Sequence, residues 1–373
     1  VFLRRALFQV HLWVGVLSAL YLIVVSLTGA ALMFRIHLQR AVHPDLFVES
    51  VGELADPVDV LETVRDAYPG GRVSGVDAPT TVRPTYLAYV TTGDRFQTIL
   101  ADRVSGAVLG ELPDHSLVRT LQDLHFDLLA GRTGRIVNGV GGFCLLLLCL
   151  TGLVVWWPGR SNWRRGFTID WTRPWKRIIW DAHSAIGIWT VVLTAIWALS
   201  GIYFAFPTEF RTAVNWVSPV TVTRTPSSVA TGAPALNWPE LIDRARGHEP
   251  DAFIARVVPP ATEESPFQVQ FADQRPTPAG SAALRPVYLD QFTGARLAEP
   301  PSGRQTFGDT VMAWVAPLHV GNFDGLGVRL AWFVTGLAPA WLGISALVLW
   351  WTRVVTPRCA RSPMPKPVDR AHA

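Results

Sequence analysis

The sequence has few charged residues and few cysteines. Only 17% of its 373 residues are charged, whereas 49% are hydrophobic, and the mean hydropathy is +0.26. This balance is unlike that of a soluble globular protein. The net charge of +4 is modest, so it gives no reason to expect a nucleic acid as partner. The three cysteines form no CxxC pair, which argues against thiol redox chemistry and against a zinc site.

Four apolar runs are long enough to cross a lipid bilayer, which takes about 20 residues. None contains Lys, Arg, Asp or Glu, and many of the 16 tryptophans stand near the ends of the runs, as they do at membrane interfaces. The first run is too long for the apolar core of a signal peptide, so we expect it to be a retained span. The runs are Ala6–Phe34, Ile136–Trp157, Ala182–Thr208 and Leu330–Thr352.

Basic residues gather on one side of these expected spans. They are Arg4 and Arg5, then Arg160, Arg164, Arg165, Arg173, Lys176 and Arg177, and finally Arg353, Arg358, Arg361 and Lys366. The positive-inside rule places them in the cytoplasm, together with both termini. We therefore expect spans at 1–35, 130–158, 179–207 and 326–352, a basic cytoplasmic loop at 159–178 and a disordered tail at 353–373. Segments 36–129 and 208–325 then face outward, into the periplasm of a Gram-negative cell.

The two halves of the sequence repeat each other. His11, Gly15, Thr28 and Gly29 recur at the same spacing as His183, Gly187, Ser200 and Gly201. Likewise, His125, Gly131 and Arg135 recur as His319, Gly325 and Arg329. Because each half has two spans, both halves insert the same way round, and a pseudo-two-fold axis along the membrane normal should relate them. The fold class is therefore a four-helix transmembrane bundle made of two tandem parallel halves.

His11 and His183 lie about two turns inside the cytoplasmic edge of spans one and three. A single histidine at that depth is most simply a neutral side chain bonded to a carbonyl, or one that reaches back to the interface. Two symmetric histidines that face each other are instead suited to hold a haem iron, for which His is a common ligand. A bare zinc ion would need further N, S or O ligands there. We expect His11 and His183 to be one pair of axial ligands.

His125 and His319 precede spans two and four by about three turns, so we expect them at the outer interface as a second axial pair. The glycines Gly15, Gly29, Gly187 and Gly201 share the histidine face of their helices, where they would let a flat ring approach the backbone. Small residues also serve as helix contacts in membranes. Three basic residues near the outer pair are suited to haem propionates, or to interfacial anchoring: Arg132, Arg135 and Arg329.

The other histidines have no counterpart in the repeat. We interpret them as surface residues, although His37 lies close enough to the outer pair to replace or supplement a ligand. They are His37, His43, His115, His248 and His372.

Several motifs resemble those of the PepSY-associated transmembrane proteins, often described as iron-regulated inner-membrane proteins. They are His11-Leu-Trp-Val-Gly15, Leu27-Thr28-Gly29, Leu124-His125, Leu150-Thr151-Gly152 with Trp156-Trp157, Asp181-Ala-His183 and Pro317-Leu318-His319-Val-Gly321. The phrases Asp102-Arg-Val-Ser-Gly106 and Asp290-Gln-Phe-Thr-Gly294 resemble turns of PepSY modules, which implies two small α+β PepSY-like periplasmic domains. Each has one short helix followed by strands. Span four departs from the pattern, since Ser345 replaces the threonine and Pro339 interrupts the helix.

The resemblance implies a function. Members of this family include di-haem reductases of ferric siderophores such as ferrioxamine. The resemblance therefore implies two haem b groups and a location in the bacterial inner membrane. It also implies reduction of a ferric siderophore in the periplasm, and hydroxamates are one class of siderophore to consider. Quinol or a cytoplasmic reductase would supply the electrons, because the sequence has no dinucleotide-binding glycine fingerprint. Two alternatives stay open. One is a haem b cytochrome with a protein acceptor, and the other is a non-redox PepSY regulator with structural histidines.

Overall fold

The computed structural model describes residues 2–157, 159, 163–221, 225–230, 232–275, 284–298, 305–321, 323 and 325–356. The chain forms two compact units, which are described separately. The first contains residues 1–30, 125–206 and 333–373, and the second contains 31–124 and 207–332. Several residues discussed above lie outside the described part: Arg160, Arg358, Cys359, Arg361, Lys366 and His372.

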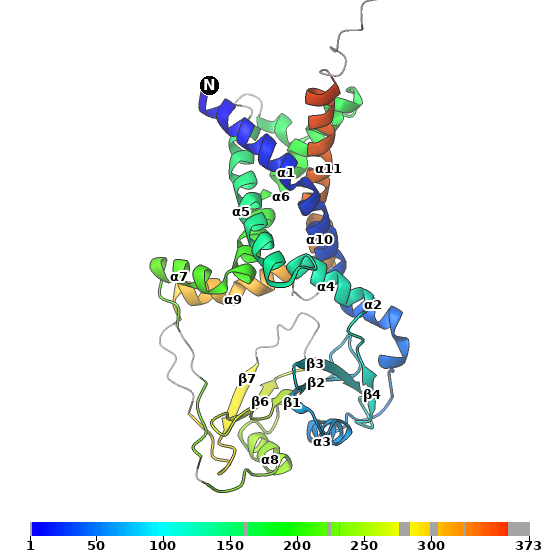
Figure 1. The fold of residues 1–373 in the computed structure, drawn as a ribbon, viewed down its shortest axis with the longest axis vertical. Helices are drawn as coiled ribbons and strands as arrows, with labels where there is room; N and C mark the ends of the chain where they lie inside the picture. Colours follow the sequence, from blue (N-terminus) through cyan, green and yellow to red (C-terminus); the bar gives the residue numbers. More distant parts are fainter. Residues whose placement is uncertain are drawn as a thin grey trace, which may run out of the picture. The chain divides into compact units, whose positions relative to one another are not determined.

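Four helical segments are long and apolar enough to cross a membrane, as the sequence predicts. A helix satisfies its own backbone polar groups, which is what a chain in hydrocarbon requires. Each segment begins a few residues before the predicted run, because the helix already includes the polar residues ahead of it, and the first three end slightly earlier than predicted (Figure 1). The spans are α1 (Phe2–Leu32), α5 (Gly131–Trp156), α6 (Trp175–Ala205) and a fourth made of α10 (Leu326–Gly336) and α11 (Ala338–Trp350) with a π-helical turn at Trp351–Val355.

The fourth span is interrupted where the sequence places Pro339. α10 ends at Gly336, and the proline stands in the first turn of α11, where its missing N–H costs nothing. Ser26 of α1 compensates for the break. Its hydroxyl donates to the carbonyl of Gly336 (2.5 Å) and accepts from the amide of Ala340 (3.2 Å). The backbone groups released by the interruption therefore find a partner inside the bundle.

Glycines bring the helices of the bundle together. A Cβ at Gly142 of α5 would lie 2.9 Å from a carbon of Ile202 in α6, and one at Gly343 of α11 would lie 3.0 Å from the carbonyl oxygen of Ala19 in α1. Tyr21 of α1 packs directly on Gly141 of α5. Since lipid provides no hydrophobic force between helices, such close backbone contact is what holds a membrane bundle together.

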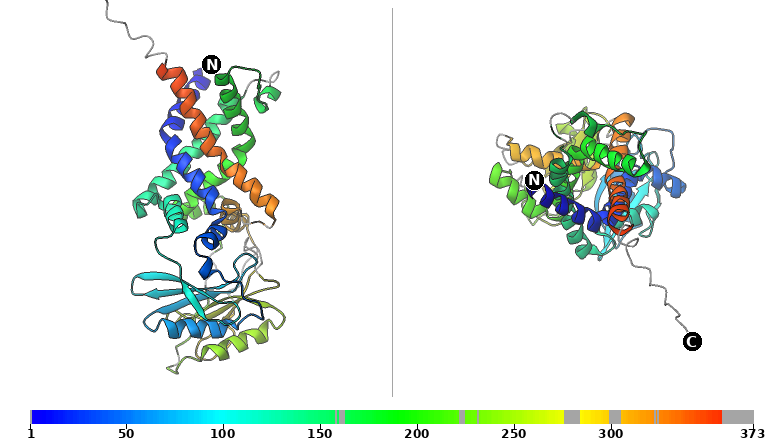
Figure 2. Two further views of the ribbon diagram at one scale, coloured as in Figure 1. Left: turned by 90° about the vertical axis from the view of Figure 1, so that its right-hand side faces the viewer. Right: turned by 90° about the horizontal axis from the view of Figure 1, so that it is seen from above.

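The second unit contains one seven-stranded antiparallel sheet of order β4-β3-β2-β1-β5-β6-β7. The strands are β1 (Arg72–Asp77), β2 (Tyr86–Thr92), β3 (Arg95–Ala101), β4 (Val108–Glu111), β5 (Phe253–Val258), β6 (Phe267–Ala272) and β7 (Arg285–Leu289). The helices α3 (Pro57–Ala67) and α8 (Trp238–His248) cover one face, as Figure 2 shows. Both expected outer segments therefore supply a helix and strands, as predicted, but they share one sheet.

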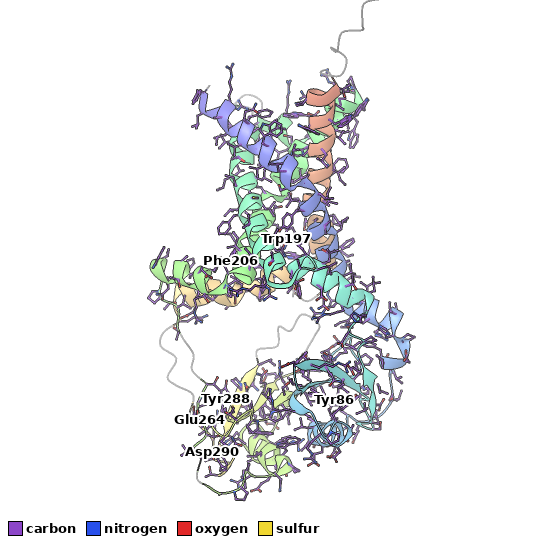
Figure 3. The ribbon with its side chains drawn as sticks, viewed as in Figure 1. Tyr86, Trp197, Phe206, Glu264, Tyr288 and Asp290 are labelled. Atoms are coloured by element: carbon purple, nitrogen blue, oxygen red, sulfur yellow. The ribbon has the colours of Figure 1, made fainter. Side chains whose placement is uncertain are left out.

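The two segments also share one hydrophobic core. Leu61 of α3 and Ile242 of α8 pack with Tyr86 and Phe267 in a single buried cluster. The Tyr86 hydroxyl donates to the carbonyl of Ala55 (2.6 Å), so this phenol is satisfied although it is almost fully buried (Figure 3). Separate PepSY-like domains stay an interpretation of the sequence, because the core joins the two segments.

The junction between the segments is the pair β1–β5, in which Val76 lies opposite Val257. Both strands carry an irregularity at the same place. Register shifts between Val73 and Gly75 in β1, and between Ile254 and Arg256 in β5. Strand β1 is not recognised from the sequence, because its polar residues and its glycine interrupt the alternation of apolar and polar side chains that is typical of a strand.

An aspartate organises the turn after the third strand of each segment. In the first, Asp102 accepts from the amides of Val104 (2.9 Å) and Ser105 (2.8 Å). In the second, Asp290 accepts from the amides of Phe292 (3.0 Å) and Thr293 (2.8 Å). The predicted similarity of these two phrases is thus a similarity of hydrogen bonding.

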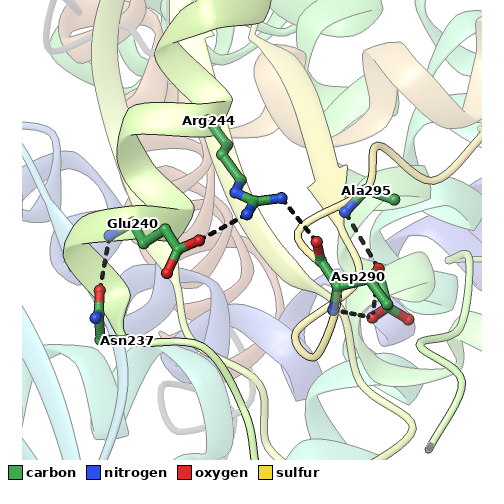
Figure 4. A network of polar contacts seen from close by, with 6 residues as sticks. Asn237, Glu240, Arg244, Asp290 and Ala295 are labelled. Carbon is green, nitrogen blue, oxygen red and sulfur yellow. Dashed lines mark hydrogen bonds and ion pairs between the residues drawn. The ribbon is translucent and has the colours of Figure 1, made fainter.

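The second of these turns is tied to α8 by Arg244. Its guanidinium donates to the carbonyl of Thr293 (2.7 Å) and to the carboxylate of Glu240 (2.6 Å), and Asn237 caps the same helix (Figure 4).

The remaining helices stand next to the spans in the sequence. They are α2 (Arg35–Val42), α4 (Leu117–Asp127), α7 (Pro207–Val217) and α9 (Phe307–Val320), with short 3₁₀ turns at Pro44–Leu46 and Trp163–Phe167. Asp309 joins the segment that follows α7 to α9, since it accepts from the Thr221 amide (2.7 Å) while closing the capping box of α9 with Thr306.

Candidate functional site

His11 lies on α1 in its N-terminal part and is oriented by α5. Its Nδ1 lies 3.0 Å from the hydroxyl oxygen of Thr151. That hydroxyl already donates to the carbonyl of Leu147 (2.7 Å), so it must accept from the imidazole. His11 therefore carries its proton on Nδ1, and Nε2 carries the lone pair.

His183 on α6 repeats this arrangement with α11. Its Nδ1 lies 2.7 Å from the hydroxyl oxygen of Ser345, which donates to the carbonyl of Trp341 (2.8 Å). The same tautomer follows. Ser345, which stands where span two has Thr151, thus keeps the hydroxyl that the histidine uses.

The rings of His11 and His183 are both half-buried. Gly152 of α5 makes room for the first ring, since a Cβ there would lie 3.2 Å from the Cε1 of His11. Both predicted inner histidines belong to the first unit, and the structure adds Thr151, Ser345 and Gly152 to their surroundings, while their pairing stays a prediction.

His125 lies on α4 and is oriented by the C-terminal part of α1. Its Nδ1 donates to the carbonyl oxygen of Val25 (3.0 Å) and lies 3.2 Å from the hydroxyl of Thr28. Because a carbonyl can only accept, the proton is again on Nδ1. The ring rests on Gly29, where a Cβ would lie 2.7 Å from its Cε1. The predicted neighbours His125 and Gly29 are therefore in contact.

His319 lies on α9, in the second unit, two residues before Gly321. That glycine ends the helix in the left-handed region, with φ of 65°. The backbone takes positive φ values shortly after both histidines, at Leu128 and Leu129 after His125 and at Gly321 after His319. The pairing of His125 with His319 joins residues of different units and stays a prediction.

The other predicted residues are placed as follows. Gly15 and Gly187 each face a leucine of the neighbouring span, Leu148 and Leu342, with 3.7 Å between the Cβ site and a methyl carbon. Gly201 has nothing within 4 Å of its Cβ site. A role under a porphyrin stays a prediction for all three.

Arg132 and Arg135 are exposed and Arg329 is half-buried. None of the three forms an ion pair with a carboxylate of the described residues.

The unpaired histidines mostly match expectation, since His37, His115 and His248 are exposed. His43 differs. It is half-buried at the end of α2, and its Nε2 is shielded from solvent without a hydrogen-bond partner. Its position beside the polar start of a 3₁₀ turn gave no hint of this burial.

The donor set fits a haem better than a bare ion. Among the described residues no three His, Cys, Asp or Glu side chains gather in one place. A haem iron needs only two protein ligands, because the porphyrin supplies the other four. Imidazoles held by Nδ1–H bonds to hydroxyl or carbonyl oxygens are oriented as metal-binding histidines are. The residues present therefore fit haem ligation.

The four apolar spans define a multi-pass membrane protein. The sequence profile described as the PepSY-associated TM region matches residues 8–353, and the chain belongs to this family. It is also similar to an uncharacterized protein of Pseudomonas aeruginosa, with 27% identity over 255 residues, which cover 62% of this chain and 63% of that protein. The chain thus spans less than two thirds of this relative's length.

Proposed function

We propose that the protein is a di-haem b reductase of the bacterial inner membrane that passes electrons outward to a ferric siderophore. The observation that supports this most is the repeated pair of contacts His11–Thr151 and His183–Ser345. Each joins an odd span to an even span, at matching positions of the sequence repeat. We further propose that the chain consists of two tandem parallel halves with both termini in the cytoplasm.

Packing between spans supports the tandem arrangement. Gly142 of α5 approaches Ile202 of α6, and Gly336 of α10 approaches Ala30 of α1, with 4.0 Å from the Cβ site to the alanine carbon. These are equivalent pairs in the repeat. Each half therefore presents its even span to the odd span of the other half in the same way.

Haem iron held between two imidazoles gains and loses single electrons at little cost in geometry. The residues would divide the remaining work. His11 and His183 would be the inner ligands, and Thr151 and Ser345 would fix their tautomer and ring orientation. His125, held by Val25 and resting on Gly29, would be an outer ligand, with His319 as its partner.

The length of α1 sets the separation of the two sites. Gly29, which touches His125, follows His11 by 18 residues, or about 27 Å of helix. Two haems at these depths would cover most of a bilayer core of about 30 Å. Arg132, Arg135 and Arg329 would neutralise propionates near the outer site.

The proposed substrate follows from coordination chemistry. Siderophores bind ferric iron through hard oxygen ligands, and ferrous iron is softer and binds these ligands poorly. Addition of one electron to the ferric complex therefore releases the metal. The electron donor would be quinol or a cytoplasmic reductase.

Purified protein from haem-replete cells tests the proposal. We expect the spectrum of low-spin haem b at about two haems per chain, as a repeat with two histidine pairs requires. His11→Ala and His183→Ala should each remove one haem and leave the other, and His125→Ala should remove the other one. His115→Ala, an exposed histidine, is the matched control.

A colourless wild-type protein would contradict the haem proposal and favour the regulatory alternative. The substrate is tested separately, by mixing dithionite-reduced protein with ferric hydroxamate siderophores. Reoxidation at a rate that depends on siderophore concentration is expected. A reduced spectrum that no siderophore changes would favour a cytochrome with a protein acceptor.

A further inference from the structure

The end of α4, just after His125, has an unusual backbone. The helix stops at Asp127, and the next two residues, Leu128 and Leu129, have φ of 54° and 60°. Two successive leucines in the left-handed region are strained, because each Cβ approaches a neighbouring carbonyl. Such a turn persists only where surrounding contacts hold it. The carbonyl groups of the last turn of α4 also need hydrogen-bond donors.

Asn138 of α5 supplies these donors. Its Nδ2 donates to the carbonyl oxygens of His125 (2.6 Å) and Phe126 (3.1 Å). Its Oδ1 accepts from the hydroxyl of Tyr21 on α1 (2.8 Å). Because both backbone partners can only accept, the orientation of the amide is determined by its contacts. A side chain from the span that follows thus fixes the backbone of the proposed ligand.

These contacts form a closed circuit through three helices. Tyr21 lies one turn before Val25 on α1, and Val25 accepts the Nδ1–H of His125. The imidazole of His125 is therefore held by α1, its carbonyl by Asn138 of α5, and Asn138 in turn by Tyr21 of α1. Movement of His125 would require at least two of these hydrogen bonds to break.

The second half contains an equivalent contact. Trp332 stands at the position of the repeat that corresponds to Asn138. Its indole N–H donates to the carbonyl oxygen of Leu318 (3.0 Å), the residue before His319. Its ring packs on Gly321, the left-handed residue that ends α9; a Cβ there would lie 2.5 Å from the Cδ1 of Trp332.

Asparagine and tryptophan are dissimilar residues, so a sequence comparison does not align them as equivalent. The feature they share is a side-chain N–H. In both halves this N–H, from the beginning of a span, caps the C-terminal carbonyls of the helix that carries the outer histidine. We propose that Asn138 and Trp332 are positioning residues for the two outer histidines, and that Tyr21 supports the first of them. This inference rests on the proposed function, because it assigns these contacts to the outer haem.

The test uses the full-length protein in detergent with three variants that remove a donor at little cost in volume. Asn138→Leu removes the amide, Trp332→Phe keeps a ring against Gly321 but removes the N–H, and Tyr21→Phe keeps the ring that packs on Gly141. Val137→Ala, next to Asn138 on the exposed side of α5, is the control. The readouts are haem content, the electron paramagnetic resonance spectrum and the reduction potential of each haem.

We expect Asn138→Leu to change the resonance and potential of one haem and to weaken retention of that haem on the order of 10-fold, at the low end for an outer-shell contact. The other haem should keep its wild-type signals. Trp332→Phe should affect the same haem, and Tyr21→Phe should cause a smaller shift in the same direction. Val137→Ala should change neither haem.

Wild-type signals for both haems in Asn138→Leu and Trp332→Phe would refute the positioning role and leave the proposed function intact. Changes confined to the inner haem would refute it as well. If Asn138→Leu does not fold, Trp332→Phe and Tyr21→Phe decide, since each removes one polar atom or group. If the wild-type protein holds no haem, the proposed function fails. Amide hydrogen exchange over 117–130, which Asn138→Leu should accelerate, then still tests the contact itself.

Discussion

Replacement of Thr151 by valine is the most direct test of how the inner histidines are held. Valine keeps the shape of threonine but cannot accept the Nδ1–H of His11, which lies 3.0 Å from the hydroxyl oxygen. The Nδ1–H of His11 would then lose its hydrogen bond to the hydroxyl. Loss of such a bond makes the imidazole a poorer electron donor to iron, which destabilises the oxidised state more than the reduced one.

The size of the effect follows from the energy of one hydrogen bond. A typical bond contributes about 1 kcal/mol net. We assign this free energy to stabilisation of the oxidised state, because the N–H of the ligand imidazole is more acidic there. For a one-electron couple, about 1.4 kcal/mol corresponds to about 59 mV, so the proposed inner haem should gain about 40 mV in potential. Ser345→Ala should raise the same potential by a similar amount, because Ser345 accepts from His183.

The assay is a spectroelectrochemical titration of purified protein, with Thr190→Val as the control. Thr190 is a buried threonine of α6. Its hydroxyl donates to the carbonyl of Ile186 (2.8 Å), as the hydroxyl of Thr151 donates to the carbonyl of Leu147. An inner potential within about 10 mV of wild type in Thr151→Val would refute the reasoning, since about 40 mV is expected from the lost bond. An equal shift in Thr190→Val would refute it too, because the cause would then be general packing.

Three further predictions follow from the geometry. Gly29→Val should remove one haem and spare the other, because its Cβ would lie 2.7 Å from the ring of His125; absorbance with both haems at full content would contradict this. Gly152→Leu should likewise displace His11 and lower the content of the opposite haem, which a haem assay resolved by potential would detect. Asp102→Asn should lower the unfolding free energy of the second unit by about 2 kcal/mol, as expected for hydrogen bonds to a charged group, when calorimetry is done at pH 7. Burial alone would raise the pKa of Asp102, but hydrogen bonds from Ser105, Ser50 and Val104 outweigh it and lower the pKa to about 2. Its stabilisation is therefore complete above about pH 4 and lost as the pH falls toward 2, so melting temperatures of variant and wild type should converge there.

The spans could be predicted because hydrocarbon imposes one solution on an uncharged run of 20 or more residues. The interruption of the fourth span at Pro339 could also be predicted, because proline removes a backbone hydrogen-bond donor. The flanking helix α7 was missed because Pro207 and Glu209 read as the end of a span rather than the start of another helix. Its aromatic and charged residues have no strong period of their own.

The site could be predicted only at the level of residue type. The sequence repeat indicates His11 and His183 as equivalent residues, and it makes Ser345 the counterpart of Thr151. It gave no sign that these hydroxyls are the histidines' partners, because a partner on another helix depends on packing that only tertiary structure defines. Asn138 and Trp332 were missed for a related reason. A repeat is recognised by identity of side chains, whereas these two residues share a single donated proton.

The pairing of β1 with β5 has a consequence for assembly. Val76 and Val257 occupy the same place relative to the irregularities of their strands, and they face each other directly. Antiparallel strands that meet through equivalent residues have a local two-fold axis between them, as two copies in a symmetric dimer would. Under the proposed duplication, each half closes a sheet edge that the other would leave open to unwanted pairing. A half-length chain should therefore either dimerise through this strand or aggregate. A single polypeptide that contains both halves ensures that β1 pairs with β5.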